Sequence, residues 1–361
     1  MLWRFALDAK KKIVIFGLTV SSSWGNGHAT VWRALLRSLG AMGHRSVFFE
    51  HDVSYYADTR DLNEGDGYDL VLYREWDEIA KRAEGELREA DAGIVTSYCP
   101  DAIVATDLVT SQRDLLRVFY DLDTPITLDR LARGEDVEYL PHDGYSRFDL
   151  VLSFTGGRAL DAIREDLGAK RAVPLYGSVD TASHRPVDPS PRYQSDLSYL
   201  GTYAADRQEG VERLLVGPAR KLNERRFVIG GSMYPHDFPW SENIWFLEHV
   251  PPPEHPAFYS SSKLTLNVTR GAMAKYGHCP SGRLFEAASC GTPILSDTWD
   301  GLDEFFEPGK EIIVARTTEE AVDAMQTPAA ELARIGYAAR KRALGDHSAQ
   351  RRAEQLLEAI Q

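Results

Sequence analysis

The residue types best suited to chemistry are concentrated in one segment, GHCPSGRLFEAASCGTPILSDTWDGLDEFFEPGKEIIVA, residues 277–315. A turn of small residues, Pro280 to Gly282, leads into an expected helix that carries Arg283 and Glu286. Backbone N–H groups at a helix start can bind phosphate oxygens, and an arginine can add a bidentate charged contact. A glutamate one turn into the helix can accept hydrogen bonds from both hydroxyls of a ribose. The segment therefore predicts a site for a phosphorylated nucleoside.

A glycine-rich loop near the N-terminus, GLTVSSSWGNGH, starts at Gly17 and follows an apolar strand pattern. A dinucleotide-binding loop needs the spacing G-x-G-x-x-G directly after its strand, but here seven other residues separate Gly17 from Gly25. Glu50 and Asp52, at the end of the next expected strand, keep an NAD(P)-dependent dehydrogenase among the alternatives. His28, at the expected helix start, could act as a base, donate a hydrogen bond, or only cap its own turn.

A pair of aspartates, Asp121 and Asp123, stands at the carboxyl end of another expected strand, in FYDLDTP. Ligands bind at these strand ends in open α/β sheets. The D-x-D spacing leaves four interpretations open. The pair could bind a metal with a nucleotide-sugar diphosphate, provide a phosphatase-type nucleophile, serve as a base or acceptor ligand, or only form a turn with Pro125.

The elements that must position these residues alternate along the chain. Apolar strand patterns occur at residues 12–18, 45–52, 68–75, 91–98, 116–123, 148–155, 195–203, 226–231, 263–269, 292–297 and 311–315. Helix-length amphipathic segments occur at 29–44, 76–90, 207–222, 283–291, 318–326 and 331–361. Such alternation predicts parallel, doubly wound sheets.

The chain is long enough for two domains of ordinary size, with 361 residues. We expect an N-terminal domain at 1–175, a linker rich in Pro, Ser and Asp at 176–194, and a second domain at 195–335. The final stretch, 336–361, is expected to form helices that pack back on the first domain. The predicted fold class is thus α/β, with two Rossmann-like domains facing a cleft.

Composition and charge exclude several classes of function. Acidic residues outnumber basic ones, 54 against 41, which gives a formal charge of −13 and disfavours nucleic acid as a partner. Three cysteines with no C-x-x-C pair fit a reducing cytoplasm better than a disulfide framework. No apolar run reaches the roughly 20 residues of a membrane span. We therefore expect a cytoplasmic protein without a transmembrane segment.

Several motifs together resemble a known family. The order R-x-F-E-A-x-x-C-G-x-P-I-L-S-D, followed by G-L-x-E-F-F-E-P-G-K-E, resembles the C-terminal domain of GT-B glycosyltransferases. DLSYLGTYAADR and HPAFYSSSKLTLNVTR resemble the CgeB-like (spore maturation) branch of the "glycosyl transferases group 1" set, and FYDLDTP and FDLVLSFTGG resemble its first-domain segments. The resemblance covers most of 195–315 well and the first domain loosely.

The resemblance also implies which residues bind a nucleotide sugar. Glu286 matches the residue that holds the ribose, and Ser281, Gly282 and Arg283 match the loop and helix start under the diphosphate. Arg207 matches a basic residue that reaches the same phosphates, and His249 and Val250 lie in the loop that reads the base. The implied binding set is completed by Gly25, Gly27, Gly201, Tyr203, Gly231, Asn267 and Arg270. The implied catalytic residues are Asp123, His28, Arg207 and Arg283.

The activity implied by the resemblance is transfer of a sugar from a nucleoside-diphosphate sugar, with UDP as the default nucleotide, to an unidentified acceptor. It implies no metal and no separate cofactor, because cationic side chains and a helix dipole can replace a metal. Many retaining relatives carry a glutamate eight positions before the ribose ligand, where this chain has His278, so the stereochemical outcome stays open. Alternatives are a nucleotide-sugar epimerase of the same fold and a non-catalytic carbohydrate-binding or surface-layer protein.

Overall fold

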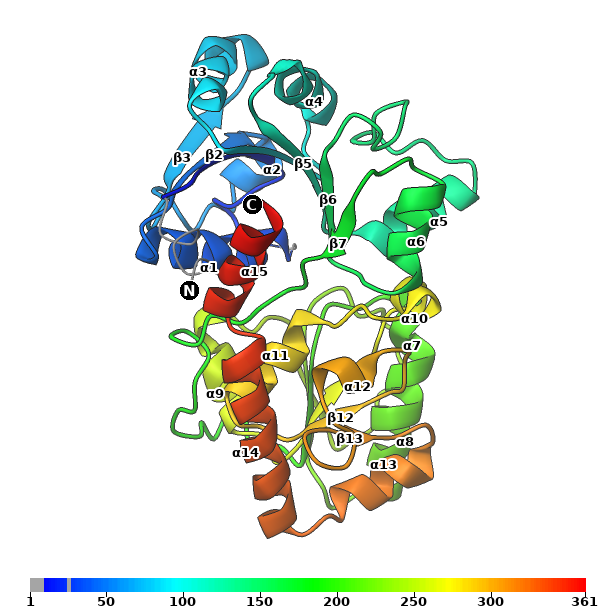
Figure 1. Cartoon of the computed structure of the whole chain (residues 1–361). Coiled ribbons are helices and arrows are strands. Elements are labelled where there is room, and N and C mark those ends of the chain that lie inside the picture. Colours follow the sequence, from blue (N-terminus) through cyan, green and yellow to red (C-terminus); the bar gives the residue numbers. More distant parts are fainter. Residues whose placement is uncertain (1–9, 25–26) are drawn as a thin grey trace, which may run out of the picture. The chain divides into compact units, whose positions relative to one another are not determined.

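The computed structural model describes residues 10–24 and 27–361 of the chain (Figure 1). These residues fold into two α/β units, each built on a parallel sheet. Residues up to Gly177, together with Ala349–Gln361, belong to the first unit, and Ser178–Ser348 form the second. The passage from one unit to the other at 177/178 falls inside the segment predicted as a linker, 176–194.

The sheet of the first unit has the strand order β3-β2-β1-β4-β5-β6-β7, and its described strands all pair in parallel. The strands are β1 (Lys12–Gly17), β2 (Arg45–His51), β3 (Asp69–Tyr73), β4 (Ala92–Thr96), β5 (Leu116–Asp121), β6 (Leu150–Ser153) and β7 (Ala172–Pro174). The chain order reverses between β1 and β4, because β2 and β3 lie on one side of β1 and the later strands on the other. In open α/β sheets this reversal creates a ligand-binding crevice at the carboxyl ends of the strands.

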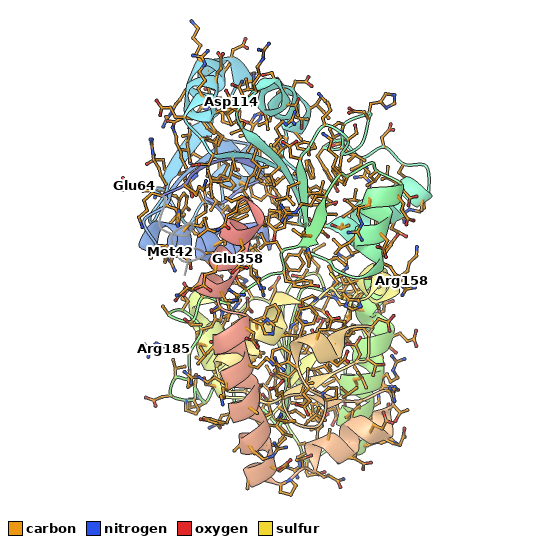
Figure 2. The ribbon with its side chains drawn as sticks, in the orientation of Figure 1. Met42, Glu64, Asp114, Arg158, Arg185 and Glu358 are labelled. Carbon is orange, nitrogen blue, oxygen red and sulfur yellow. The ribbon has the colours of Figure 1, made fainter. Side chains whose placement is uncertain are left out.

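Both faces of this sheet are covered, which explains why its strands read as nearly continuous apolar runs. Val14 and Phe16 of β1 belong to a core that includes residues of α3, α4 and α6, whereas Ile13 and Ile15 belong to a core that includes residues of α1 and α15. The helices are α1 (His28–Ala41), α2 (Ser54–Ala57), α3 (Trp76–Arg88), α4 (Ala102–Ser111), α5 (Thr124–Ala132), α6 (Arg158–Glu165) and α15 (Ala349–Ala359). Figure 2 shows side chains filling the space between the sheet and these helices.

The sheet of the second unit has the strand order β10-β9-β8-β11-β12-β13, again with parallel pairing. Its strands are β8 (Leu197–Leu200), β9 (Phe227–Gly230), β10 (Ile244–Leu247), β11 (Thr265–Asn267), β12 (Ile294–Ser296) and β13 (Ile313–Val314). The order reverses between β8 and β11, so this unit has the same kind of switch point as the first.

Helices follow most strands of the second unit. They are α7 (Ala205–Val211), a π-helical turn η1 (Glu212–Val216), α8 (Gly217–Lys221), a 3₁₀ turn η2 (Pro252–Glu254), α9 (His255–Ser260), α10 (Gly271–Tyr276), α11 (Gly282–Ser289), α12 (Leu302–Phe305), α13 (Thr318–Met325) and α14 (Ala329–Asp346). None of the helices in the described ranges combines the length and the apolar character needed to cross a membrane.

The C-terminal helices are divided between the units. α14 belongs to the second unit and packs against α11, while α15 belongs to the first and lies beside α1 (Figure 1). Arg352 of α15 donates two hydrogen bonds to the carbonyl oxygen of Gly177, at 3.2 and 3.0 Å. Of the stretch 336–361, which was expected to pack on the first domain, α15 belongs to the first unit and the end of α14 to the second.

Candidate functional site

The switch point of the second sheet brings together residues from β8, β11 and α11. Arg283 lies in the first turn of α11 and is only 9% exposed. Its Nε donates to the carbonyl oxygen of Leu200 at 2.5 Å, and its Nη1 donates to Oδ1 of Asn267 at 3.1 Å. Its guanidinium carbon lies 4.9 Å from the ring centre of Tyr199. The two strand ends therefore fix the guanidinium in one orientation.

Gly201 is required by this arrangement. A Cβ at this position would lie 2.7 Å from Nη2 of Arg283 and 3.1 Å from the Tyr199 hydroxyl, so any side chain would displace the guanidinium. Gly231, which follows β9 with φ +148°, supports the same turn, because a Cβ there would lie 2.1 Å from the carbonyl oxygen of Gly201. Gly201 thus leaves room for the guanidinium of Arg283, and Gly231 leaves room for the carbonyl oxygen of Gly201.

A second arginine, Arg207 of α7, adds positive charge at the same strand end. Its Nη2 donates to the carbonyl oxygen of Thr202 at 2.6 Å, and its Nε is buried with no hydrogen-bond partner among the described residues. Burial lowers the pKa of Arg207, and the nearby charges of Arg283 and Arg270 lower it further. Within residues 10–24 and 27–361, neither Arg207 nor Arg283 forms an ion pair with a carboxylate. The pair is therefore a cationic site with no carboxylate in direct contact among the described residues, and Glu286 is a nearby negative charge that acts on Arg283 over a longer distance.

Arg270 is in a different situation, because its charge is already paired. Its Nε lies 3.2 Å from Oδ2 of Asp206, which also accepts from the backbone N–H of Gly271 at 3.1 Å. This carboxylate connects the start of α7 to the start of α10. The pairing with Asp206 helps to hold the loop after β11, and the predicted contact of Arg270 with a nucleotide sugar stays a prediction.

Glu286 lies one turn farther along α11 than Arg283. Its Oε2 accepts a hydrogen bond from the Tyr259 hydroxyl at 3.2 Å, and a Cβ at Gly282 would lie 4.0 Å from its Oε1. Burial raises the pKa of Glu286, but His184, His255 and Arg283 together bring that pKa below its ordinary value. The carboxylate is therefore ionised at neutral pH and has one oxygen near the start of the helix.

The turn that precedes α11 leaves the helix N-terminus without a side-chain cap. Ser281 occupies the N-cap position with extended backbone, and its side chain forms no capping hydrogen bond. N–H groups in the first turn of α11 can therefore bind an anion, which the helix dipole also favours. Of the residues predicted here, Ser281, Gly282 and Arg283 lie at this helix start. Gly201 and Asn267 are next to the side chain of Arg283, and the charge of Arg207 is near that of Arg283.

His278, which occupies the position of the second glutamate in retaining relatives, is turned toward the loop before α12. It adopts φ +43°, its backbone N–H donates to the carbonyl oxygen of Asp300 at 2.6 Å, and its Nδ1 lies 3.2 Å from Oε2 of Glu304. Its ring packs against Gly301, where a Cβ would lie 2.3 Å from Nδ1. The imidazole thus helps to hold the loop at 298–304.

Three further residues were predicted in this unit: Tyr203, Val250 and His249. Their described contacts are with residues other than Arg283. Tyr203 donates to the side chain of Gln208, and its ring lies 5.6 Å from that of Tyr234 in a group of aromatic rings. Val250 is buried, and its carbonyl oxygen lies 3.1 Å from Nε2 of His255. His249 is exposed. Tyr203 and Arg207 line the same small cavity. The predicted contacts of His249 and Val250 with a base stay predictions.

In the first unit, the structure joins the two predicted catalytic residues, His28 and Asp123. Nε2 of His28, at the start of α1, lies 2.7 Å from Oδ2 of Asp123, the N-cap residue of α5. Nδ1 of His28 is buried and has no hydrogen-bond partner among the described residues. The carboxylate orients the imidazole, and Nδ1 is the nitrogen left to accept a proton. The interpretation of His28 as only a helix cap is wrong.

Asp121 differs from His28 and Asp123 in its burial and in its hydrogen bonds. It is fully buried, accepts from the Tyr145 hydroxyl at 2.9 Å and from the backbone N–H of Asp123 at 3.0 Å. Burial, followed by the nearby charge of Asp123, raises the pKa of Asp121 to about 6. A buried carboxyl whose two oxygens already accept hydrogen bonds is poorly suited to a D-x-D metal site.

The glycine-rich loop after β1 is held by Glu50, which sequence reasoning considered only for a dehydrogenase. This fully buried carboxylate accepts from Thr19 Oγ1 at 2.8 Å, from Ser21 Oγ at 2.5 Å and from the N–H groups of Val20 and Ser21 at 2.7 and 2.9 Å. Asp52, the other candidate, pairs with Arg60. Neither carboxylate has the freedom to bind a ribose hydroxyl, which argues against a dehydrogenase.

Of the two glycines predicted in that loop, Gly25 lies outside the described residues. Gly27 is the N-cap residue of α1 with φ −87°, and a Cβ added there would meet nothing within 4 Å. Neither its backbone conformation nor its packing requires glycine. The open space beside Gly27 is compatible with close approach of a ligand. The contact of Gly27 with a ligand stays a prediction.

Two Rossmann-like units with switch points of this kind are the architecture of GT-B glycosyltransferases. Residues 207–358 match the family model described as glycosyl transferase-like. The match spans most of the second unit and nearly all of α15. No curated protein sequence matches the chain.

Solved structures with the same fold cover nearly the whole chain. A sucrose-phosphate synthase from Thermosynechococcus elongatus has a TM-score of 0.69 at 13% identity, covering 97% of this chain and 98% of its own. HepE of Anabaena in complex with UDP-glucose has a TM-score of 0.66 at 12% identity, covering 97% and 99%. An alpha-glucosyltransferase in complex with UDP-glucose and DNA has a TM-score of 0.71 at 12% identity, covering 98% and 100%. These matches confirm the predicted fold class.

Proposed function

We propose that this protein is a glycosyltransferase that moves a sugar from a nucleoside-diphosphate sugar to an acceptor. The observation that carries the proposal is the pair Arg207 and Arg283, which the described chain leaves without a carboxylate partner beside the uncapped start of α11. Burying two cationic groups without a counter-ion is costly, and a diphosphate would compensate both.

The donor is proposed to bind to the second unit, with its diphosphate on Arg207, Arg283 and the first turn of α11. Glu286 is ionised and one helical turn away, so its Oε1 can accept from the ribose hydroxyls. His249 and Val250 remain the proposed contacts of the base. UDP is the proposed nucleotide, supported by the UDP and UDP-glucose complexes of structural neighbours.

The reaction breaks the bond between the anomeric carbon and the oxygen of the β-phosphate, and the electron pair leaves with the nucleoside diphosphate. Negative charge therefore grows on the β-phosphate, where preorganised donors contribute most. Arg283 is held in place before the donor arrives, so little reorganisation is required. Two guanidinium groups and a helix N-terminus supply the charge that a divalent cation supplies elsewhere, and we propose that catalysis needs no metal.

The acceptor hydroxyl must lose its proton as it attacks the anomeric carbon. Within the first unit, Nδ1 of His28 is the proposed base for an acceptor hydroxyl, because Nε2 is engaged by Asp123 at 2.7 Å. Asp123 would then stabilise the imidazolium that forms. The membership of the CgeB-like branch and the cytoplasmic location stay predictions of the sequence.

The proposal is tested by incubating the full chain with a panel of nucleoside-diphosphate sugars and measuring nucleoside diphosphate by chromatography, with water taking the sugar in place of the acceptor. We expect release from one donor class, its loss in Arg283→Ala, and its retention in Arg220→Ala, an exposed arginine of α8 whose Nη2 donates to the Pro239 carbonyl oxygen. Conversion of the donor to an isomeric sugar nucleotide would favour an epimerase instead. Absence of both products and of any nucleotide binding would refute the proposal.

A further inference from the structure

Glu286 stands in a second group of residues that the donor chemistry leaves unexplained. His184, from the segment 178–194, and His255, the first residue of α9, each place one nitrogen near the Glu286 carboxylate. One ligand atom from each of the three residues lies within 4.8 Å of the others. The two imidazole rings are 6.3 Å apart, centre to centre. We refer to these residues as the His184–His255–Glu286 cluster. Figure 2 labels Arg185, the next residue after His184.

Hydrogen bonds around the cluster leave the appropriate lone pairs free. Nε2 of His255 lies 3.1 Å from the carbonyl oxygen of Val250, and because a carbonyl only accepts, Nε2 must carry the hydrogen. Nδ1 of His255 is then an acceptor. Glu286 receives the Tyr259 hydroxyl on Oε2 and keeps Oε1. These are the outer contacts that usually orient metal-bound histidines and carboxylates.

His184 is the strongest single indication of a missing ligand. Both of its ring nitrogens are buried, and neither has a hydrogen-bond partner among the described residues. A buried imidazole carries at least one N–H and one further polar nitrogen, so leaving both unsatisfied is costly. The Ser289 hydroxyl donates to the backbone carbonyl oxygen of His184 at 2.6 Å, which fixes the backbone but not the ring.

We propose that the His184–His255–Glu286 cluster binds a divalent transition-metal ion of the zinc class. Two imidazole nitrogens and one carboxylate oxygen form a ligand set suited to Zn²⁺ or Co²⁺ and unlike the all-oxygen sets of Mg²⁺ and Ca²⁺. Ligands lie about 2.0–2.2 Å from zinc, so two of them in a tetrahedral site are about 3.4 Å apart. Binding therefore draws the three ligand atoms together from their separations of up to 4.8 Å, and a fourth position stays open to water.

The consequence for catalysis is inhibition, and this part rests on the proposed function. Metal binding occupies a lone pair of Oε1 and draws the Glu286 carboxylate toward the two histidines, so the carboxylate is no longer placed to accept from the ribose hydroxyls. Metal and donor then exclude each other, and the metal is no part of the transfer reaction. Zinc in excess lowers activity, and a chelator restores it.

The test uses Co²⁺ as the probe, because four-coordinate Co²⁺ absorbs visible light. Chelator-treated full-length protein is titrated with Co²⁺ alone, and the same titration is run on His184→Ala, Glu286→Gln and the exposed control His236→Ala. We expect one equivalent to bind to the wild type and the control, and at least a 100-fold weaker response in the other two, since even outer-shell partners change metal affinity 10–100-fold. Glu286→Gln keeps the size of the side chain and an oxygen for Tyr259, so it separates loss of a ligand from misfolding.

Absence of a visible band in the wild type, or a band that persists in both ligand variants, overturns the metal site. UDP is then added to the Co²⁺-loaded protein, and loss of the band is the expected result. If UDP binds while the band persists, the mutual exclusion is wrong. If UDP fails to bind the metal-free protein, the proposed donor site fails, while the Co²⁺ result is independent of it.

Discussion

Replacement of Arg283 by alanine is the change whose effect on donor binding can be worked out most fully. An arginine carries five N–H donors, and the structure uses one on Leu200 and one on Asn267. Three remain, and Nη2 lies beside the space above Gly201. Two charge-assisted hydrogen bonds to a diphosphate, at about 1.5 kcal/mol each, contribute roughly 3 kcal/mol to binding. Alanine should therefore weaken UDP binding about 150-fold.

Thermal unfolding with and without UDP measures this loss. At a UDP concentration of about 100 times the wild-type Kd, the wild type gains roughly 2.7 kcal/mol. A 150-fold weaker variant at that concentration gains only about 0.3 kcal/mol. At roughly 2–4 °C per kcal/mol for a folding unit of this size, the wild-type melting temperature should rise by about 5–11 °C and that of the variant by about 1 °C.

The comparison is made within each variant, because removing Arg283 also takes a hydrogen-bond donor from the Leu200 carbonyl oxygen and from Oδ1 of Asn267, which destabilises the free protein. Arg220→Ala serves as the matched control and should keep the full shift. An Arg283→Ala protein that folds and still gains most of the wild-type stabilisation would refute the placement of the diphosphate.

Three further predictions concern other parts of the structure. His28→Ala should lower kcat about 10²–10⁴-fold with little change in UDP binding. Asp123→Asn should also lower kcat, because the His28 imidazole loses the carboxylate that orients it. Equal kcat values for wild type and both variants in a transfer assay would contradict the role of the pair. The pKa of Asp121 is about 6 in the folded protein and near the ordinary 3.8 in the unfolded chain, so stability should fall by on the order of 3 kcal/mol as pH rises from about 4 to above 6. Urea unfolding should show a flatter pH profile for Asp121→Asn, and an unchanged profile would disprove this assignment. Gly231→Ala should destabilise the protein by on the order of 3 kcal/mol, since its Cβ would lie 2.1 Å from the Gly201 carbonyl oxygen at φ +148°; a melting temperature within 1 °C of wild type would count against that close approach.

The fold could be predicted largely from the periodicity of apolar residues. The elements that this prediction missed have physical reasons. Apolar runs such as that at β1 read as strands because both faces of the sheet are covered. Helix α4 (AIVATDLVTS) was not predicted, because its apolar and β-branched residues lack a clear helical stripe. Strand β10 was also not predicted, because it is a short edge strand with Trp245 and Phe246 exposed.

The site could be predicted where neighbours in sequence remain neighbours in space. Ser281 to Glu286 lie on one turn and one helix, so their spacing alone indicated an anion-binding helix start. Contacts between distant segments could not be foreseen in this way. His184 lies in a segment rich in Pro, Ser and Asp about a hundred residues before Glu286, and no periodic pattern connects the two.

Glu50 illustrates the same limit in the first unit. An acidic residue at the end of the second strand suggests a ribose ligand, yet the four hydrogen bonds that its carboxylate accepts all come from the loop after β1. Whether such a carboxylate holds a ligand or its own backbone depends on loop conformation, which residue types alone do not determine.

The measurement that tests the central claim most directly is a crystal structure of the full chain with UDP. The account predicts diphosphate density at the start of α11, in contact with Arg283 and Arg207, and the ribose hydroxyls on Glu286. Nucleotide density on the loop between Gly17 and His28, with the arginine pair left empty, would contradict it.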